Sequence, residues 1–557
     1  MRLQVRGCLF LGIFLLFCAV ASAQGTYTAA SCSYHDVNAC INNDSEGSCS
    51  PKRHGAVDGD TVIIPTCTSM TPDPSKCTGN TWCSQLTITK AITLKGQGIG
   101  STVLIDNNPK GCSGNKPLIS ISPPGTAGWR ITGFTVWPYS GEAATAGCSG
   151  EILIGGGSHA FRVDHIECDF DGYNGTPGTW TPDGSGTDGA GATNCIMTEG
   201  DLWGVIDHVK MYGWRKHAVM VHHRQWGTPG TNSGGDVSWA QADSMGAYGH
   251  PSNGIADGAA VYMEDDVAVQ THPNSGSNPF ACEWGARCVL RFSETPTVGS
   301  HGPEGSDRGI RHIEVYNNNM HMANTASWNN GSHNGKAVSV RSGTALVFNN
   351  DITSSTNDYV VATELSYYRC NLGAAHICRA YNPWGICDGT SAWDKIPSTG
   401  PYPCLDGIGR GQGVLVKRSS PAWPNEVLDP VYSWGNRMQG NQYPGVSAHP
   451  VGNPPQFTEN VDYYNEVSGF NGTVGVGRGA LANRPNCSPT ACTAGVAYWA
   501  TDQGNWNHSG KATWDGSTQG TLYRWSGSAW ETYYVPFPYP HPLVTEADGA
   551  ESQLESH

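Results

Sequence analysis

Short runs in which apolar and polar residues alternate recur along the chain, and each run leads into a polar turn. The first clear run, Ile131–Val136, is followed by similar runs at 163–168, 206–211, 263–267, 316–320 and 348–352. Successive runs start from about thirty to more than fifty residues apart, and helical periodicity is almost absent. A unit of strand, polar turn and strand that repeats without helices is typical of a solenoid of stacked parallel strands.

Two of the polar turns join an aspartate to a histidine, at Asp164–His165 and at Asp207–His208. Asn, Asp and His tolerate turn geometry, so we expect these pairs to lie at the corners of coils. Side chains at equivalent corners stack from one coil to the next. We favour this interpretation over a pair of catalytic dyads.

Three segments near the N-terminus resemble the opening coils of the right-handed parallel β-helix superfamily. They are Gly59–Pro65, Ile92–Gly98 and Thr102–Ile105, and the preceding stretch His35–Asn43 would be the short cap of such a helix. Farther along the chain, Gly204–Val209 is similar to a coil of the pectate-lyase-like branch.

The resemblance covers roughly residues 35–365. It implies an all-β fold, namely a right-handed, single-stranded parallel β-helix with a disulfide-rich N-terminal cap and a C-terminal capping region. It does not specify an activity, because this fold carries lyases, hydrolases, epimerases, adhesins and phage tailspikes.

We expect six parts along the chain. They are a signal peptide (1–23), a Cys-rich N-terminal cap with the first coil (24–90), the parallel β-helix (91–365), a Cys-rich loop excursion (366–430), a C-terminal capping region (431–545) and a disordered tail (546–557). The tryptophans of the capping region are expected to cover the helix rather than to stack on sugars.

The first residues have the features of a secretory signal. Arg2 and Arg6 precede the apolar run Cys8–Val20, and small residues at Ala21–Ala23 offer a cleavage site. No later stretch is long and apolar enough to span a bilayer, so we expect an exported protein without membrane insertion.

The cysteines support export. The sequence has 20 cysteines, of which Cys8 and Cys18 lie in the predicted signal. The rest form clusters and close pairs, such as Cys282 with Cys288 and Cys487 with Cys492, without the spacing of a zinc site. We therefore predict disulfides formed in an oxidising compartment.

Composition narrows the function classes. Only 14% of the residues are charged, whereas there are 72 glycines and 34 prolines, which fits a turn-dense β protein. The formal net charge of -15 argues against a nucleic-acid partner, and the 19 tryptophans and 22 tyrosines suit contacts with sugars.

In a β-helix, sites form on the outer face of a sheet, and strand alternation predicts which side chains point there. On five candidate strands, apolar residues alternate with polar ones. If the apolar side chains face the core, the polar side chains point outward. Long insertions at 227–258, 271–283 and 299–309 are predicted to flank them. We expect one groove on the face shared by Glu264, Arg291, His312 and Arg341.

A polysaccharide lyase acting on uronic acids is the first functional interpretation. Such an enzyme must neutralise a carboxylate, remove a proton and protonate the leaving oxygen. The candidate catalytic residues are Arg291, His301, Arg308, Arg341 and Glu264. The candidate substrate-binding residues are Tyr262, His222, Arg224 and His312, and the candidate ligands of a Ca²⁺ ion are Asp265 and Asp266. Arg291→Ala and Arg341→Ala should leave the fold intact while turnover falls.

Two alternatives remain open. Asp265–Asp266 followed by Ser300–Gly302 is similar in order to motifs of inverting polygalacturonase-type hydrolases, which use paired carboxylates. The other alternative is a non-catalytic, adhesin-like β-helix that binds a polysaccharide or a cell-surface glycan.

Overall fold

The computed structural model describes most of the chain between Gln24 and Thr545. The described residues are 24–51, 55–68, 77–108, 117–125, 127–138, 150–169, 194–200, 202–212, 217–222, 260–269, 278–283, 286–300, 310–322, 335–354, 360–366, 407–412, 427–439, 448–450 and 457–545.

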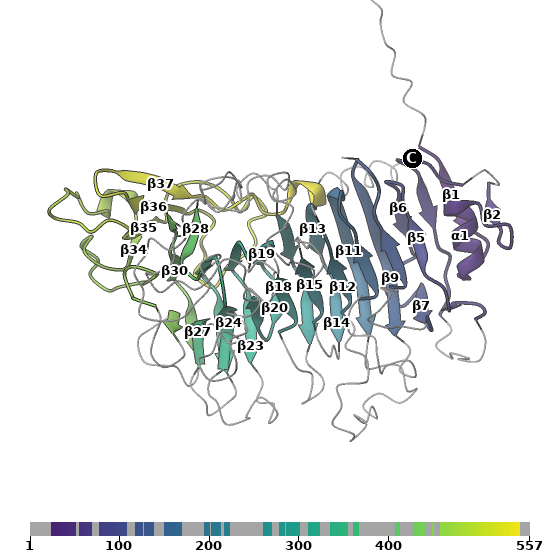
Figure 1. Cartoon of the computed structure of the whole chain (residues 1–557), viewed down its shortest axis with the longest axis horizontal. Helices are drawn as coiled ribbons and strands as arrows, with labels where there is room; N and C mark the ends of the chain where they lie inside the picture. The colour runs from purple at the N-terminus through teal and green to yellow at the C-terminus, as the bar shows by residue number, and fades with distance from the viewer. Residues whose placement is uncertain are drawn as a thin grey trace, which may run out of the picture.

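The chain forms a parallel β-helix, as the repeated strand pattern predicts (Figure 1). Each complete coil contributes one strand to each of three parallel ladders. The first ladder contains β1 (Thr26–Ala29), β3 (Thr61–Ile63), β6 (Thr93–Lys95), the start of β9 (Trp129–Pro138), the start of β11 (His159–Asp169), β13 (Trp203–Asp207), β16 (Val261–Glu264), β19 (Arg287–Arg291), β22 (His312–Tyr316), β25 (Thr344–Phe348), β30 (Val431–Trp434) and β33 (Tyr463–Asn465).

The other two ladders run beside the first. The second contains β4 (Thr81–Trp82), β7 (Val103–Asp106), the ends of β9 and β11, β14 (Lys210–Tyr212), β17 (Val267–Val269), β20 (Glu294–Thr295), β23 (Asn319–Met322), β26 (Asp351–Ser354) and β31 (Arg437–Gln439). The third contains β5 (Leu86–Ile88), β8 (Ile119–Ile121), β10 (Ile152–Ile154), β12 (Ile196–Thr198), β15 (Val219–His222), β18 (Phe280–Glu283), β21 (Val298–Ser300), β24 (Gly335–Val340), β27 (Val360–Leu365) and β32 (Ala448–Pro450).

One residue with a left-handed backbone makes each sharp corner between the first and second ladders. The column of corner residues is Gly133, His165, His208, Asp265, Phe292, Asn317, Asn349 and Gly435, with φ between 50° and 79°. Glycine, asparagine, aspartate and histidine tolerate this conformation better than most residues, which explains the recurring polar turns of the sequence.

Immediately after each corner, the next side chain points into the helix. This column begins with the apolar Phe134, Ile166 and Val209, and the later coils replace them by polar side chains. Asn318 donates its amide to Asn350 at 3.0 Å, and Asn350 donates to Asn436 at 2.9 Å. The amide side chains thus hydrogen-bond the coils to one another inside the core, where an unpaired polar group would be costly.

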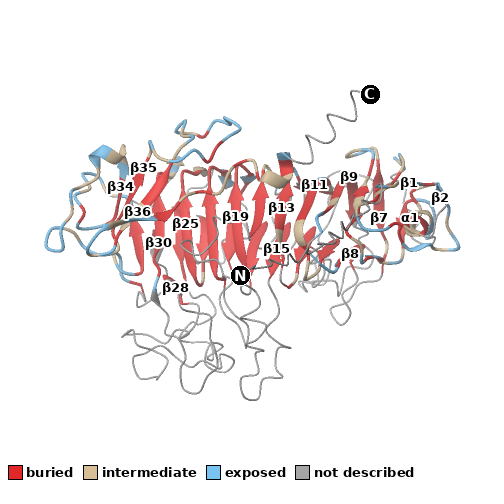
Figure 2. Ribbon diagram, turned by 90° about the horizontal axis from the view of Figure 1, so that it is seen from above, coloured by how far each residue is buried: buried red, intermediate tan, exposed pale blue. Residues whose placement is uncertain are grey.

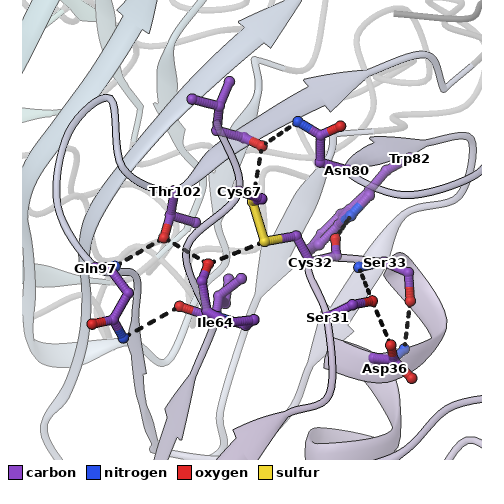
Figure 3. The surroundings of a disulfide bond; sticks show 12 residues. Ser31, Cys32, Ser33, Asp36, Ile64, Cys67, Asn80, Trp82, Gln97 and Thr102 are labelled. Atoms are coloured by element: carbon purple, nitrogen blue, oxygen red, sulfur yellow. Dashed lines mark hydrogen bonds between the residues drawn. A yellow bond between two sulfur atoms is a disulfide. The ribbon is translucent and has the colours of Figure 1, made fainter. Parts of the chain in front are cut away.

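The N-terminal end of the helix is closed by α1 (Tyr34–Asn42) and β2 (Cys49–Ser50), which pairs antiparallel with β1. Ser33 caps the helix by accepting a hydrogen bond from the Asp36 amide. Cys32, just before the helix, forms a disulfide with Cys67, and its carbonyl accepts a hydrogen bond from buried Trp82 at 2.8 Å (Figure 3).

The C-terminal part of the chain packs against the side of the helix. After β33, a four-stranded sheet forms from β34 (Val476–Gly479), β35 (Ala497–Ala500), β36 (Thr521–Trp525) and β37 (Trp530–Tyr534). Residues 535–545, which we call the C-terminal strap, then run back along the first ladder towards β13 (Figure 1).

The strap and the C-terminal sheet create a second hydrophobic core on the outer face of the first ladder. On the ladder side it contains Tyr262, Val289, Tyr316, Leu346, Phe348, Tyr432 and Trp434, and on the other side Trp499, Trp506, Leu522, Trp525, Tyr533, Tyr534, Tyr539 and Val544. Trp506 and Trp525 are only 2% and 3% exposed, so they serve packing, as predicted for this region. Figure 2 shows that β19, β25 and β30, which contribute to the ladder side of this core, are buried.

The described cysteines are all paired. Six disulfides join Cys32–Cys67, Cys40–Cys49, Cys77–Cys83, Cys168–Cys195, Cys282–Cys288 and Cys487–Cys492. The two close pairs singled out in the sequence are confirmed as bonds, and disulfides of this number indicate an oxidising compartment. Within the described ranges, no helix has the length and hydropathy needed to cross a membrane.

The all-β parallel helix with a disulfide-rich cap is confirmed, and two details differ from expectation. The ladders continue past residue 365 through β30, β31, β32 and β33. The C-terminal region covers the side of the helix along several coils, because the aromatic residues on that face need an apolar partner.

Candidate functional site

Four of the predicted site residues lie on the outer face of the first ladder. Tyr262 and Glu264 belong to β16, Arg291 to β19 and His312 to β22. The register places Glu264 directly beside Arg291. Strand alternation therefore predicted the outward direction of these side chains.

These four side chains are nevertheless buried, with exposed fractions of at most 1%. The expectation of a solvent-exposed row on β16, β19 and β22 is wrong, because the C-terminal strap covers this face. Arg291 donates to the carbonyl oxygens of Phe537 at 2.7 Å and Pro538 at 2.9 Å. Glu264 accepts a hydrogen bond from the His541 amide at 2.9 Å.

Burial controls the electrostatics beneath the strap. Burial raises the pKa of Glu264, although Arg291 acts in the opposite direction. Burial and the charge of Arg291 lower the pKa of His541 to about 3, so this imidazole is neutral. Tyr534 donates its hydroxyl to Glu314, and the His312 ring hydrogen-bonds Thr344. The first bond joins the C-terminal sheet to the ladder, the second joins neighbouring strands of the ladder, and each satisfies a buried polar group.

The fourth member of the predicted groove lies elsewhere. Arg341 directly follows β24 in the third ladder, whereas Glu264, Arg291 and His312 lie in the first. The single shared groove is therefore wrong. Alternation along a strand fixes the side of the sheet on which a residue lies, but not which of three ladders the strand joins.

The predicted Ca²⁺ ligands do not act as a pair. Asp265 is a corner residue that is bound by Lys511 and by the Tyr539 hydroxyl at 2.6 Å. Asp266 points into the helix, where its Oδ1 accepts from the Val209 amide at 2.8 Å. Burial raises the pKa of Asp266 well above its usual value, which disfavours the charged carboxylate that a cation requires.

Three other predicted residues, Arg224, His301 and Arg308, lie outside the described residues. His222 is described and lies at the end of β15 in the third ladder, next to Glu283 of β18. His222 and Arg341 are thus the predicted residues that lie on this second face.

A carboxylate held between two imidazoles is the central feature of the third-ladder face. Glu283 Oε2 lies 3.4 Å from His222 Nε2, and Glu283 Oε1 lies 3.7 Å from His217 Nε2. The other His217 ring nitrogen contacts the Asn278 carbonyl oxygen at 2.7 Å, which orients the ring. Glu283 and both histidines are more than nine-tenths buried, although they lie on the outer side of the sheet.

Register extends this cluster into a row along the helix axis. Glu199 follows β12 at the position next to His222, and Arg341 occupies the same column two coils after Glu283. With ~4.8 Å between parallel strands, four coil steps separate Glu199 from Arg341 by roughly 20 Å. Both ends of the row are partly exposed. We call Glu199, His217, His222, Glu283 and Arg341 the third-ladder cluster.

The column beside this cluster is apolar. Leu153, Met197, Met220 and Ala281 follow one another on successive coils and are 3% to 8% exposed. Gly299 continues the column, and the Asn278 side chain occupies the space that a Cβ atom there would need. An apolar wall beside a polar row is the usual composition of a ligand site.

Sequence reasoning missed Glu199, His217 and Glu283 as candidates for one site. The spacing between His222 and Glu283 does not show that they meet, because the strands they end become neighbours only in the folded ladder.

The third-ladder cluster combines groups that can accept, hold and donate protons with a guanidinium that binds carboxylates. Among the described residues, no group of His, Cys, Asp and Glu side chains is arranged to hold a metal ion. Comparison of the chain with protein-family models, curated protein sequences and solved structures finds no match.

Proposed function

We propose that this protein is a secreted, pectate-lyase-like β-helix that cleaves an extracellular, uronic-acid-containing polysaccharide by β-elimination. The observation that supports this proposal is the Glu283 carboxylate between the His217 and His222 rings, in one row with Arg341. The disulfides and the signal-like N-terminus support secretion.

The chemistry assigns a role to each group. Arg341 binds the uronate carboxylate, which increases the acidity of the adjacent carbon-bound proton. His222 accepts that proton, and Glu283 orients the ring and stabilises the imidazolium that forms. The proton then returns to the leaving oxygen as the glycosidic bond breaks and a C4–C5 double bond appears in the product.

A bound Ca²⁺ ion has no part in this scheme. The carboxylates expected to hold it, Asp265 and Asp266, face different environments and do not converge. The acidic group of the substrate is instead matched by a guanidinium, which carries its charge at every physiological pH.

An inverting glycoside hydrolase is the second candidate. Glu199 and Glu283 are two coil steps apart in one column, so their Cα atoms lie roughly 10 Å apart at ~4.8 Å per step. Carboxylates of inverting enzymes lie about 6.5–9.5 Å apart, which side chains leaning towards each other would satisfy. A glycan-binding protein without catalysis is the outcome if neither product forms.

The test is incubation of the mature protein with polygalacturonate, alginate and a glucuronate polymer, reading unsaturated uronate by ultraviolet absorbance and new reducing ends chemically. Unsaturated product supports the lyase, and reducing ends alone support the hydrolase. Binding of a polymer without either product contradicts both enzyme assignments.

Variants then link the activity to the cluster. Glu283→Gln and His222→Gln should each lower kcat/KM by roughly a hundredfold to ten-thousandfold. The matched controls are Glu294→Gln and His321→Gln, which change exposed residues of the second ladder. Equal activity of Glu283→Gln and Glu294→Gln would show that the reaction occurs elsewhere.

A further inference from the structure

The imidazole rings of His165 and His208 stack on successive coils at the corner between the first and second ladders. Their centroids are 5.0 Å apart and their planes differ by 2°. Unlike the buried histidines of the third ladder, these side chains are exposed, by 53% and 45%. The predicted stacking of corner histidines is confirmed, and the exposure of both rings adds a surface that the proposed reaction does not use.

Each ring is held in one orientation by the aspartate that precedes it. His165 Nδ1 lies 2.8 Å from Asp164 Oδ2, and His208 Nδ1 lies 2.9 Å from Asp207 Oδ2. An aspartate at Nδ1 fixes the proton on that nitrogen and leaves Nε2 as the variable site.

The aspartates are themselves fixed by arginines. Arg130 binds Asp164 through two hydrogen bonds of 2.6 and 2.7 Å, and Arg162 binds Asp207 through two of 3.0 Å. Two layers of support therefore hold the rings parallel, which is how a binding site keeps its donors in place before a ligand arrives.

When both histidines are neutral, the positive and negative charges around the rings are equal in number. The facing carboxylates are Asp164, Asp207 and Asp265, and the facing cations are Arg130, Arg162 and Lys511, with the neutral Tyr539 hydroxyl on Asp265. The hydrogen bond with Asp207 raises the pKa of His208. Protonation of the two rings thus leaves a net positive patch, in which the parallel imidazolium groups repel each other.

We propose that His165 and His208 together form an anion-binding site for the acidic groups of a polysaccharide, open at acidic pH and weak at alkaline pH. An oxyanion placed between the two Nε2–H donors accepts a hydrogen bond from each and removes their mutual repulsion. Lys511 pairs with Asp265, whose Oδ2 lies 4.0 Å from His208 Nε2, and so offsets the negative charge of that carboxylate beside the site.

The repeat of the helix suits a polymer rather than a single small anion. The two rings lie on successive coils, so the donors are spaced along the helix axis. This corner lies on a different surface from the third-ladder cluster. One part of a long polymer can therefore bind at the corner while another part of the same polymer reaches the cluster. The proposal does not depend on catalysis.

The experiment measures binding of a galacturonic acid trimer by calorimetry at pH 5 and pH 8, the range over which histidine changes charge. The trimer should bind at pH 5 at least about tenfold more tightly than at pH 8. Titration in two buffers of different ionisation enthalpy should show net proton uptake on binding. A sulfated trisaccharide tests the other source of oxyanions, and the neutral methyl ester of the trimer should not bind.

The variant His165→Asn/His208→Asn should abolish the pH dependence. Asparagine suits these corners, because Asn317 and Asn349 already occupy the same column with φ of 57° and 56°. His321→Asn is the control, since His321 is exposed on the second ladder and contacts Thr353. All binding is measured with Glu283→Gln present, so a failed catalytic proposal leaves this result unchanged.

Equal affinity at both pH values, absence of proton uptake, or unchanged binding by the double histidine variant would each overturn the proposal. The proton-uptake measurement uses the chain with both histidines in place, so it decides the question even where the double variant is poorly folded.

Discussion

The guanidinium of Arg291 binds the carboxylate of Glu264 across one coil step, with both Nε and Nη2 at 2.7 Å from Oε2. Neither side chain is more than 1% exposed. The remaining Arg291 donors reach the Tyr316 hydroxyl and two carbonyl oxygens of the strap. This ion pair is therefore the point at which the strap is fixed to the ladder.

Arg291→Met should destabilise the protein by about 3–5 kcal/mol, because it leaves the Glu264 carboxylate buried without its partner. This corrects the expectation that replacing Arg291 leaves the fold intact. Urea unfolding of the purified variant measures the change. Arg437→Met, which breaks an exposed pair with Asp351, is the control and should change the midpoint little. Equal midpoints for the two variants would contradict the structural role of Arg291.

Asp266→Asn should stabilise the protein at neutral pH. The pKa of Asp266 is raised by burial, so the folded state loses stability as pH rises from the unfolded pKa near 4 towards the folded pKa. An amide has no such dependence, and it places an asparagine one coil step before Ser293 in the column that continues to Asn318. The free energy of unfolding of wild type should fall between pH 4 and pH 7 relative to the variant. A variant that is less stable than wild type at pH 7 would refute this.

Fold and site differ in how much the sequence predicts of them. The parallel helix follows from local signals, since apolar alternation sets each strand and, except at Phe292, Asn, Asp, His or Gly sets the left-handed corners. Which strands become neighbours depends on the length of each coil. Arg341 and Glu264 therefore have the same local pattern and lie on different faces.

Tyr534→Phe should lower the free energy of unfolding by about 1–3 kcal/mol, because the Glu314 carboxylate loses a buried hydrogen-bond donor. Burial raises the pKa of Tyr534 well above its usual value, so its hydroxyl retains the proton that it donates. Thermal unfolding measures the loss. Tyr523→Phe removes a hydroxyl from a half-buried tyrosine of β36 and should have a smaller effect.

Gly299→Ala should reduce turnover more than stability. The added Cβ would lie 1.8 Å from the side-chain nitrogen Nδ2 of Asn278, so the Asn278 side chain must move. Displacing this side chain shifts the Asn278 main chain, whose carbonyl oxygen contacts His217, and a displaced imidazole no longer orients Glu283. We expect kcat/KM to fall at least about tenfold, since misplacement by about 1 Å is costly in catalysis. A loss of stability without a change in kcat/KM of the folded fraction would argue against this link.

The third-ladder cluster shows why a site is harder to predict than a fold. His222 and Glu283 are 61 positions apart in the sequence and adjacent in the register, because one coil includes a long insertion. The strap presents the same difficulty, since the contact between Arg162 and Val544 joins residues 382 positions apart. No pattern within a single strand encodes such a distance.

The strap also changes how this molecule must fold. A solenoid whose coils touch only their neighbours can form and open one coil at a time from either end. Here residues 534–544 bind coils from β11 to β22, so those coils gain part of their stability only once this later segment has packed against them. This contact between distant parts of the sequence forms slowly. Once it has formed, the coils that it joins fold and unfold together as one cooperative unit.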